Sequence, residues 1–274
     1  MPLRRIQQEA MATIAANRHP GSHIAGGTVI NRDSARYSDD IDIFHDLFSE
    51  DDRVNMLRNT VEIDAKSLIA AGFEIRWATR HPEKYQAIVT KDGESTLLDW
   101  AIDSDYRFFE SIPDDLFGFK LFDLATNKLL AAASRKEPRD VLDLLHLHKN
   151  HFPLGAAIWA APAKDPGYTP ESLIEQLGRN AVYRQDDFDR VMSDATIDAR
   201  EVAIAFRMIL AQAAEFVGSM PAGYDELAFL KDGQIIQPDP ARLSEYESLQ
   251  ARRQAHWPSS PEIGSEMIAA DLKR

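Results

Sequence analysis

Two aspartates separated by one residue are the first side chains in this 274-residue sequence whose spacing suggests chemistry. Asp40 and Asp42 belong to the segment 39–44 (DDIDIF), where polar and apolar residues alternate as in a half-buried strand. Residues i and i+2 of a strand project from the same face, so both carboxylates are expected on one side of a sheet. Such a pair is a hard oxygen site that suits Mg²⁺ or Mn²⁺ together with water and substrate phosphates. A plain alternative is the solvent face of an edge strand.

A third acid, Asp99, lies inside the apolar segment 97–101 (LLDWA). Burying a carboxylate there costs several kcal/mol unless a cation or a metal ion accompanies it. Three acids on neighbouring strands can hold two ions about 3.5 to 4 Å apart and clamp the attacking and leaving oxygens of an in-line displacement. Asp99 is therefore a candidate third metal ligand, and an ion pair with Arg76 is the structural alternative.

Glycines and basic residues could supply the phosphate-binding part of such a site. Gly26 and Gly27 leave backbone N–H groups open to a triphosphate, and the Thr28 hydroxyl could add a hydrogen bond, although a glycine pair is often only a turn. Lys128 and Arg135 share a helical face with Leu124 and Ala131, so they form one positive stripe that could contact phosphates. The alternative for these two cations is a solvated face. The run 120–149 holds six lysines and arginines and is the candidate for a basic patch.

The elements that would position these residues form an α+β fold with a mixed sheet. Apolar periodicity and turn residues predict strands at 23–25, 40–44, 73–77, 85–90 and 95–102, and helices at 3–17, 51–71, 119–134, from Pro138 onward, 170–183, 186–194 and 198–217. Asp92-Gly93 predicts a hairpin, Gly72 a helix C-cap, and either Asp51 or Asp52 the start of the second helix. Residues 152–169 are interpreted as a connector, so two lobes are expected, at 1–150 and 151–274. The last fifty residues predict little.

Composition limits the class of protein. The net charge of −13 argues against a surface made for wrapping nucleic acid, although a local basic groove remains compatible with it. The absence of cysteine excludes disulfides and thiolate metal sites. No apolar run approaches the roughly 20 residues of a membrane span and no secretory signal is evident, so a soluble cytoplasmic protein without membrane contact is expected. His146 and His148 face different ways on a helix, so we expect no metal site from that pair.

Two motifs together resemble a known family. The segments 23–28 (HIAGGT) and 36–44 (RYSDDIDIF), followed by 124–131 (LATNKLLA) and 135–144 (RKEPRDVLDL), resemble the AbiEii/AbiGii nucleotidyltransferase toxins of bacterial abortive-infection and toxin–antitoxin systems. The resemblance covers about residues 20 to 150. It implies a catalytic core of the DNA-polymerase-β-like superfamily, followed here by a helical second lobe that would grip the acceptor.

The resemblance also implies roles for residues. It places metal ions on Asp40, Asp42 and Asp99, and the triphosphate against Lys128. Asp140 or Asp143 would orient that lysine or act as a base on the acceptor, with Asp140 favoured, although an acid in the first turn of a helix also suits the macrodipole. The nucleotide site that the resemblance implies is made of Gly26, Gly27, Thr28, Ser38, Lys128, Arg135, Arg139 and Asp143.

The expected activity is an Mg²⁺-dependent transfer of a nucleotide from a nucleoside triphosphate to an acceptor hydroxyl, with release of pyrophosphate. The resemblance implies an RNA acceptor, with tRNA as one candidate, a toxin function and a partner antitoxin. A second hypothesis keeps the chemistry but makes the acceptor a protein side chain or a small molecule. A third is a catalytically silent binding module on the same fold.

Overall fold

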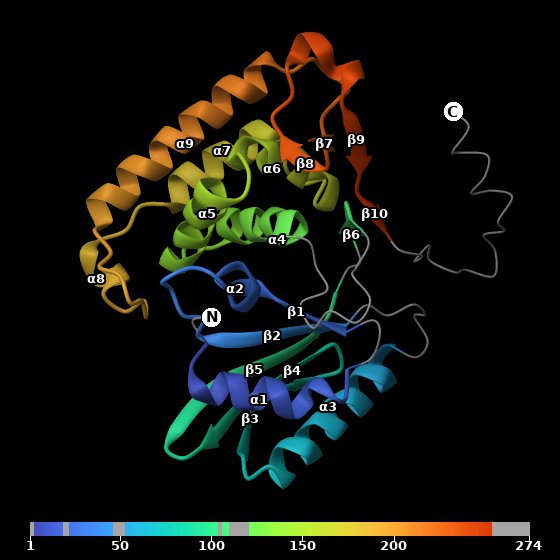
Figure 1. Ribbon diagram of the computed structural model, residues 1–274, viewed down its shortest axis with the longest axis vertical. Helices are drawn as coiled ribbons and strands as arrows, with labels where there is room; N and C mark the ends of the chain where they lie inside the picture. Colours follow the sequence, from blue (N-terminus) through green and yellow to red (C-terminus); the bar gives the residue numbers. More distant parts are fainter. Residues whose placement is uncertain (1–2, 19–21, 46–52, 104–105, 110–120, 254–274) are drawn as a thin grey trace, which may run out of the picture.

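The computed structural model describes residues 3–18, 22–45, 53–103, 106–109 and 121–253, shown as ribbons in Figure 1. The expected helix start at Asp51 or Asp52 and the basic residue Lys120 lie outside these ranges. A five-stranded sheet forms the lower half of the molecule in Figure 1, and a layer of helices covers it from above. The expected α+β class with a mixed sheet is confirmed.

The sheet has the strand order β1-β2-β5-β4-β3. Only the β2–β5 pair is parallel, and the other three pairs are antiparallel, so the sheet is mixed as expected. The strands are β1 (Ser22–Ala25), β2 (Asp40–His45), β3 (Glu74–His81), β4 (Lys84–Lys91) and β5 (Glu94–Ile102).

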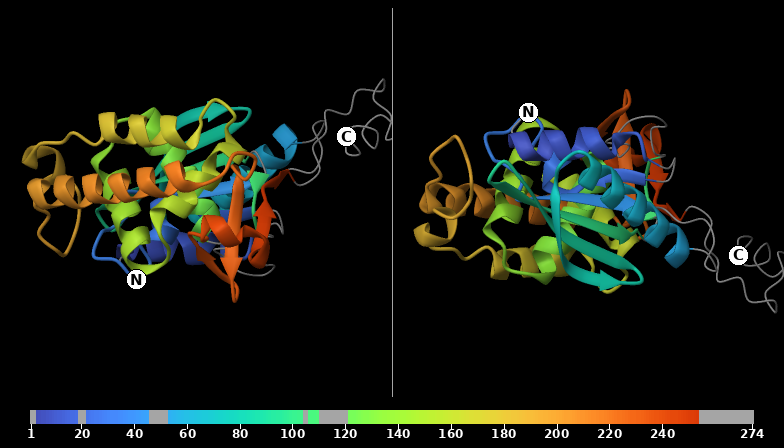
Figure 2. Two further views of the ribbon diagram at one scale, coloured as in Figure 1. Left: turned by 90° about the horizontal axis from the view of Figure 1, so that it is seen from above. Right: turned by 90° about the horizontal axis from the view of Figure 1, so that it is seen from below.

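The two faces of β2 differ as its alternation predicts. Ile41 and Ile43 are fully buried on the face covered by α1 (Arg5–Ala15) and α3 (Arg53–Ala70), where they join the hydrophobic core. Asp40 and Asp42 project to the opposite face, toward the helices that begin with α2 (Gly26–Ile30). The view from below in Figure 2 shows α1 and α3 lying across the sheet. Strand β2 therefore directs apolar side chains into the hydrophobic core on one side of the sheet and carboxylates to the other side.

Local turn and cap signals match the structure where the sequence predicted them. Asp92 and Gly93 have φ angles of 51° and 80°, which fits a two-residue hairpin of the Asp-Gly type between β4 and β5. Gly72 has φ 86°, and the N–H of Phe73 donates to the Leu68 carbonyl at 3.0 Å, so a left-handed glycine ends α3. Strand β3 is longer than expected because it pairs with β4 along nearly its whole length.

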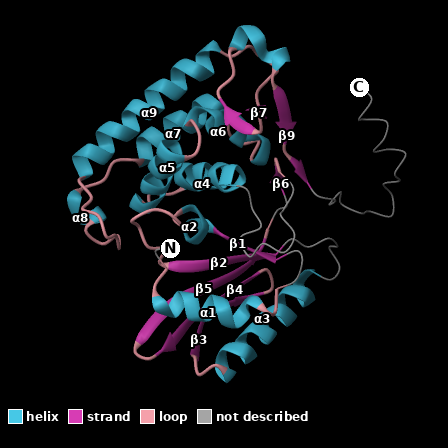
Figure 3. Ribbon diagram, viewed as in Figure 1, coloured by secondary structure: helices cyan, strands magenta, loops and turns pink. Residues whose placement is uncertain are grey.

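The upper layer consists of helices. They are α4 (Leu121–Ser134), α5 (Pro138–Asn150), α6 (Leu154–Ala160), α7 (Pro170–Asn180), α8 (Gln185–Phe188) and α9 (Ala199–Ser219), with the 3₁₀ segment η1 (Ala161–Lys164) after α6. Figure 3 shows this layer in cyan above the magenta sheet. Pro138 stands in the first turn of α5, as predicted, and Asp198 caps α9 by accepting from two backbone N–H groups.

Two of the expected elements differ. Residues 152–169 are not a connector, because 154–160 form α6, every residue of which is buried. A helix that is apolar all round shows no amphipathic period, and this removed the signal. The helix expected at 186–194 is limited to the four residues of α8, and the chain that follows it instead pairs with the loop before β2 through a bridge between Arg36 and Ser193.

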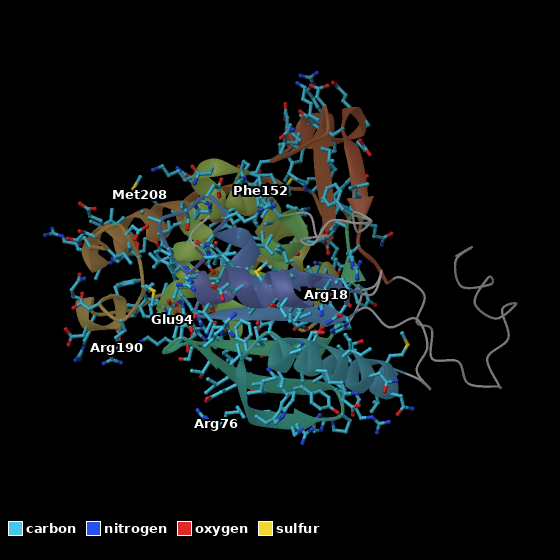
Figure 4. All side chains as sticks on the ribbon, turned by 60° about the horizontal axis from the view of Figure 1, so that its bottom comes forward. Arg18, Arg76, Glu94, Phe152, Arg190 and Met208 are labelled. Atoms are coloured by element: carbon cyan, nitrogen blue, oxygen red, sulfur yellow. The ribbon has the colours of Figure 1, made fainter. Side chains whose placement is uncertain are left out.

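Helix α9 is long and apolar enough to cross a membrane by length and composition alone. In this fold it packs against α6 and α7, with Phe206, Ile209 and Leu210 in the hydrophobic core. Met208, on the other side of the helix, is exposed and points outward in Figure 4.

The C-terminal part contains strands in a region for which the sequence predicted no elements. Strands β7 (Leu227–Lys231), β8 (Gln234–Ile236) and β9 (Glu247–Gln250) form a small antiparallel sheet, with the 3₁₀ segment η2 (Pro240–Glu245) before β9. β10 (Arg252–Arg253) pairs with β6 (Tyr106–Arg107), two segments far apart in the sequence.

Candidate active site

A cavity of about 470 Å³ lies between the polar face of the sheet and α4 and α5. Its volume falls in the range of about 300 to 1,000 Å³ that is typical of small-molecule sites. Most of the residues that the sequence singled out line it: Gly26, Gly27, Ser38, Asp40, Asp42, Asp99, Lys128, Arg135 and Arg139. Thr28, Asp140 and Asp143 do not line it and stand behind its wall.

The register of the sheet brings the three acids together. Asp42 and Asp99 are direct neighbours in the parallel pair β2–β5, and Asp40 lies two residues earlier on the same face of β2. Neither hairpin turns nor local periodicity determine this pairing, because β2 and β5 are about fifty residues apart in the chain. The predicted acidic cluster on one face of the sheet is therefore present.

The crowding of these acids changes their protonation. Burial, followed by repulsion from Asp40 and then from Asp99, raises the pKa of Asp42 to about 7, against the opposing attraction of Lys128. A carboxylate in this state is stabilised by any cation that enters the cavity. This is the electrostatic condition of a metal site whose protein ligands are oxygen atoms.

Asp99 has one occupied and one open oxygen. Its Oδ2 accepts a hydrogen bond from Gln86 Nε2 at 2.8 Å and lies 3.0 Å from Lys84 Nζ. Its Oδ1 is buried and has no hydrogen-bond partner within the described part of the chain. The cationic partner is thus Lys84 and not Arg76, which is exposed on β3, at the outer edge of the sheet in Figure 4. With Asp40 and Asp42, this open oxygen fits a divalent cation.

The glycine pair makes room for charged side chains. Gly26 has φ 65°, and a Cβ atom on it would lie 1.8 Å from Asp42 Oδ2. A Cβ atom on Gly27 would lie 2.5 Å from an Arg36 guanidinium nitrogen and 2.9 Å from Ser38 Oγ. The two glycines therefore allow strand β2 and the loop before it to approach the start of α2.

Two predicted nucleotide ligands have structural partners. The Thr28 hydroxyl does form a hydrogen bond, but it donates to the backbone carbonyl of Asp40 at 2.9 Å and so fastens α2 to β2. Ser38 Oγ donates to Asp40 Oδ1 at 3.3 Å, and this hydroxyl does face the cavity.

Lys128 forms the centre of an ion-pair cluster between α4 and α5. Its Nζ lies 3.0 Å from Asp140 Oδ1 and 3.0 Å from Asp143 Oδ2. Arg135 binds both oxygens of Asp140 at 2.8 and 3.0 Å, and Arg36 binds both oxygens of Asp143 at 2.7 and 3.0 Å. The side chain of Lys128 is only 10% exposed, so the solvated-face alternative does not hold for it.

The cluster holds its members charged. Burial opposes the ammonium form of Lys128, but Asp143 and Asp140 outweigh burial and raise its pKa. Burial likewise opposes ionisation of the two aspartates, yet the pKa of Asp140 is lowered by Arg135 and Lys128, and that of Asp143 by Lys128 and Arg36. Because both oxygens of each carboxylate already accept hydrogen bonds from cations, these aspartates are suited to orienting Lys128 and poorly suited to accepting a proton.

Arg139 stands at the rim of the cavity. Its guanidinium lies 3.0 Å from Asp39 Oδ2 and 3.8 Å from Asp40 Oδ2. Within the basic run that the sequence indicated, Lys128, Arg135 and Arg139 therefore all have carboxylate partners.

Several residues were not assigned from the sequence: Arg36, Lys84, Gln86 and Asn127, which line the cavity, and Asn31, which contacts the ion-pair cluster behind it. Two of them had a usable signal. A two-residue hairpin loop at Asp92-Gly93 pairs residue 91 with 94 and therefore sets Gln86 opposite Asp99, with Lys84 two residues farther on the same face. Asn31, by contrast, reaches Asp143 at 2.8 Å across the fold, and no local pattern indicates that contact.

No family model matches the sequence, and no curated protein matches it. Among solved structures, the chain is similar to a protein of H. pylori assigned as a nucleotidyltransferase, with 17% identity over 77% of this chain and 94% of that chain, at a TM-score of 0.46. It is also similar to the nucleotidyltransferase toxin MenT4 of Mycobacterium tuberculosis, with 16% identity over 77% of this chain and 82% of that chain, at a TM-score of 0.49. A third is the Cid1 poly(U) polymerase bound to MgATP, with 14% identity over 73% and 65% of the two chains and a TM-score of 0.31. These scores are low, so the functional conclusion rests on the residues of the cavity.

Proposed function

We propose that this protein is a metal-dependent nucleotidyltransferase that moves a nucleotide from a nucleoside triphosphate to an acceptor hydroxyl. The observation that carries this proposal is the direct pairing of Asp42 with Asp99 in one cavity with Lys128 and Arg135. One wall offers carboxylate oxygens for metal ions, and the facing wall offers fixed positive charge for phosphates. The resemblance of residues 20 to 150 to the AbiEii/AbiGii toxins supports the same activity.

The bonds of this reaction balance. The acceptor oxygen forms a bond to the α-phosphorus, the bond between that phosphorus and the α–β bridging oxygen breaks, and pyrophosphate leaves. Mg²⁺ or Mn²⁺ bound by Asp40, Asp42 and Asp99 would supply charge stabilisation for the phosphoryl oxygens. The open Oδ1 of Asp99 can serve as a ligand or accept the proton of the acceptor hydroxyl.

The cations of the other wall would position the triphosphate. Lys128 is held in place by Asp140 and Asp143, so its ammonium group is charged and fixed before the nucleotide enters. Arg135 is half exposed at the cavity and presents the guanidinium edge that Asp140 leaves free. Asp140 and Asp143 act in this proposal as positioning residues, through Lys128, Arg135 and Arg36.

For the acceptor, we propose RNA, with tRNA as the first candidate, together with a toxin role and an antitoxin partner; this part of the proposal rests on the resemblance alone. Residues 151–274 would form the acceptor-binding lobe. Arg135 and Arg139 each have carboxylate partners, so the charge at the rim of the cavity is largely balanced and suits one triphosphate better than a long polyanion, in agreement with the net charge of −13. This observation favours a protein side chain or small molecule as the second candidate acceptor.

A labelling experiment tests both levels of the proposal. The purified full chain is incubated with Mg²⁺, each α-labelled nucleoside triphosphate, and either total bacterial RNA or total protein. Asp42→Ala removes a carboxylate from the cavity, and Asp92→Asn makes a comparable charge change on an exposed turn where asparagine also adopts the required backbone.

Label in RNA that Asp92→Asn retains and Asp42→Ala loses would establish the transferase and its acceptor class. Label in protein would establish the enzyme and replace the acceptor. If neither fraction is labelled and the wild type binds no nucleotide in the presence of Mg²⁺, the proposal is wrong and the silent binding module takes its place.

A further inference from the structure

A second group of potential metal ligands lies at the C-terminal end of α5, apart from the residues that line the cavity. It consists of Asp33, in the loop between α2 and β2, together with His146 and His151. One ligand atom from each of the three residues lies within 4.8 Å of the other two. His146 Nε2 is 3.0 Å from Asp33 Oδ1, and His151 Nε2 is 3.9 Å from Asp33 Oδ2.

The state of His151 distinguishes this group from an ordinary ion pair. Its Nε2 atom is buried and has no hydrogen-bond partner in the ranges that the structure covers. The separation of 3.9 Å from Asp33 is too long for a hydrogen bond. A buried polar nitrogen without a partner is costly, whereas the same atom becomes satisfied when it binds a metal ion. An ion pair between His146 and Asp33 alone would not explain why His151 Nε2 also faces the Asp33 carboxylate.

The ligand types indicate which metal would bind. Two imidazoles and one carboxylate suit Zn²⁺ and related transition metals, with water as a fourth ligand, whereas Mg²⁺ prefers oxygen atoms only. This set differs in kind from the all-carboxylate cluster on the sheet. We propose that Asp33, His146 and His151 form a Zn²⁺-type transition-metal site that is separate from the nucleotide cavity.

Metal binding here would fasten a loop rather than take part in chemistry. Asp33 follows Asn31 and precedes Arg36, and both of these residues contact Asp143 on α5. Ser38, farther along the loop, faces the cavity. His146 and His151 belong to the end of the same α5 helix. A metal ion would therefore join the loop that supplies Arg36 and Ser38 to the helix that supplies Asp140 and Asp143.

Cobalt is a suitable probe, because Co²⁺ occupies Zn²⁺ sites and gives visible bands that report nitrogen ligands and low coordination. The full chain is titrated with Co²⁺ in four forms: wild type, Asp42→Asn to remove the carboxylate site, His151→Gln, and a control variant. His81→Gln is the matched control, since His81 is an exposed histidine on β3. Thermal unfolding with and without Zn²⁺ accompanies each titration.

The expected result is one Co²⁺ per chain that gives the visible bands, in addition to any Co²⁺ on the sheet carboxylates, and these bands persist in Asp42→Asn and His81→Gln. His151→Gln should bind about 100-fold more weakly and lose the increase in Tm that Zn²⁺ gives the wild type. If His151→Gln does not fold, Asp33→Asn replaces it, because that side chain is 61% exposed and its loss leaves the core intact. Equal binding by wild type and His151→Gln, or loss of the bands in Asp42→Asn alone, would overturn the proposal.

Discussion

Aspartates line the cavity on the sheet, and further aspartates on α5 stand behind its opposite wall; the two sets are in opposite electrostatic states. On the sheet, Asp42 is crowded by Asp40 and Asp99, and its pKa is raised to about 7. On α5, Asp140 and Asp143 are buried at least as deeply, yet cations surround them and lower their pKa values. Burial alone therefore does not determine the state of a carboxylate. The α5 aspartates are already paired with cations and hold those side chains in place. The sheet aspartates repel one another and therefore retain affinity for a cation that arrives with the substrate.

The largest effect is expected from Asp42→Asn. Transfer activity should fall on the order of 10³-fold, because a ligand of the metal ions and their charge stabilisation are lost. In the absence of metal, the same variant should unfold at a higher temperature than wild type, since a buried negative charge is removed from a like-charged cluster. Activity assays and metal-free thermal unfolding measure the two effects. An unchanged or lower metal-free Tm would show that repulsion among the sheet carboxylates does not destabilise the metal-free protein.

Asp143→Asn should have the opposite effect on stability. It leaves Lys128 and Arg36 buried with too little negative charge, and breaking such a network costs about 3 kcal/mol or more. Urea denaturation at neutral pH gives the free energy of unfolding. A loss below about 0.5 kcal/mol would mean that this cluster is no more structural than a surface ion pair.

Gly26→Ala tests how closely the sheet acids approach α2. The substitution imposes a left-handed backbone on alanine, which costs about 1 to 2 kcal/mol, and it also places a methyl group against Asp42. Gly93→Ala is the matched variant, because Gly93 has φ 80° but no atom of the described chain within 4 Å of the added Cβ. The excess loss of stability and of activity in Gly26→Ala measures the contact with Asp42. Equal losses in the two variants would argue against that contact.

The smallest effect is expected in acid. The pKa values of Asp140 and Asp143 are lower in the folded chain than their ordinary value of 3.8. Their contribution to stability is therefore complete above that value and is lost as the pH falls below it toward the folded-state values. Asp143→Asn lacks one of these groups. Between about pH 5 and about pH 3, its free energy of unfolding should therefore fall by about 1 kcal/mol less than that of wild type. Urea denaturation at these pH values compares the slopes with wild type.

Local patterns predicted the parts of the fold that local physics determines. The alternation of β2, the Asp92-Gly93 hairpin and the glycine C-cap at Gly72 each follow from a few adjacent residues. The same reasoning could have found a further hairpin, because Asp232 and Gly233, between β7 and β8, have φ angles of 52° and 74°. Helix α6 escaped because a fully buried apolar segment carries no period.

The sequence predicted which residues belong to the site but not how they are placed relative to one another. The sequence identified Asp40, Asp42 and Asp99 as one chemical group, yet only the parallel pairing of β2 with β5 sets Asp42 beside Asp99. The roles of Asp140 and Asp143 likewise depend on Arg36, which comes from a loop more than a hundred residues earlier in the chain. Contacts of this range are fixed by the packing of the whole domain, and a single sequence contains no short-range signal for them.

The pairing of β2 with β5 also constrains how the gene can change in length. Side chains on β5 alternate between the cavity and the hydrophobic core, so the distance from the Asp92-Gly93 turn to Asp99 must keep its parity. Deletion of one codon in this arm would turn the acid toward the core and bring Leu98 or Trp100 to the cavity. Deletion of two codons would return the aspartate to the cavity face, displaced by two residues along β5. Gaps of odd length in this arm are therefore compatible with an intact acid triad only where a β-bulge restores the parity.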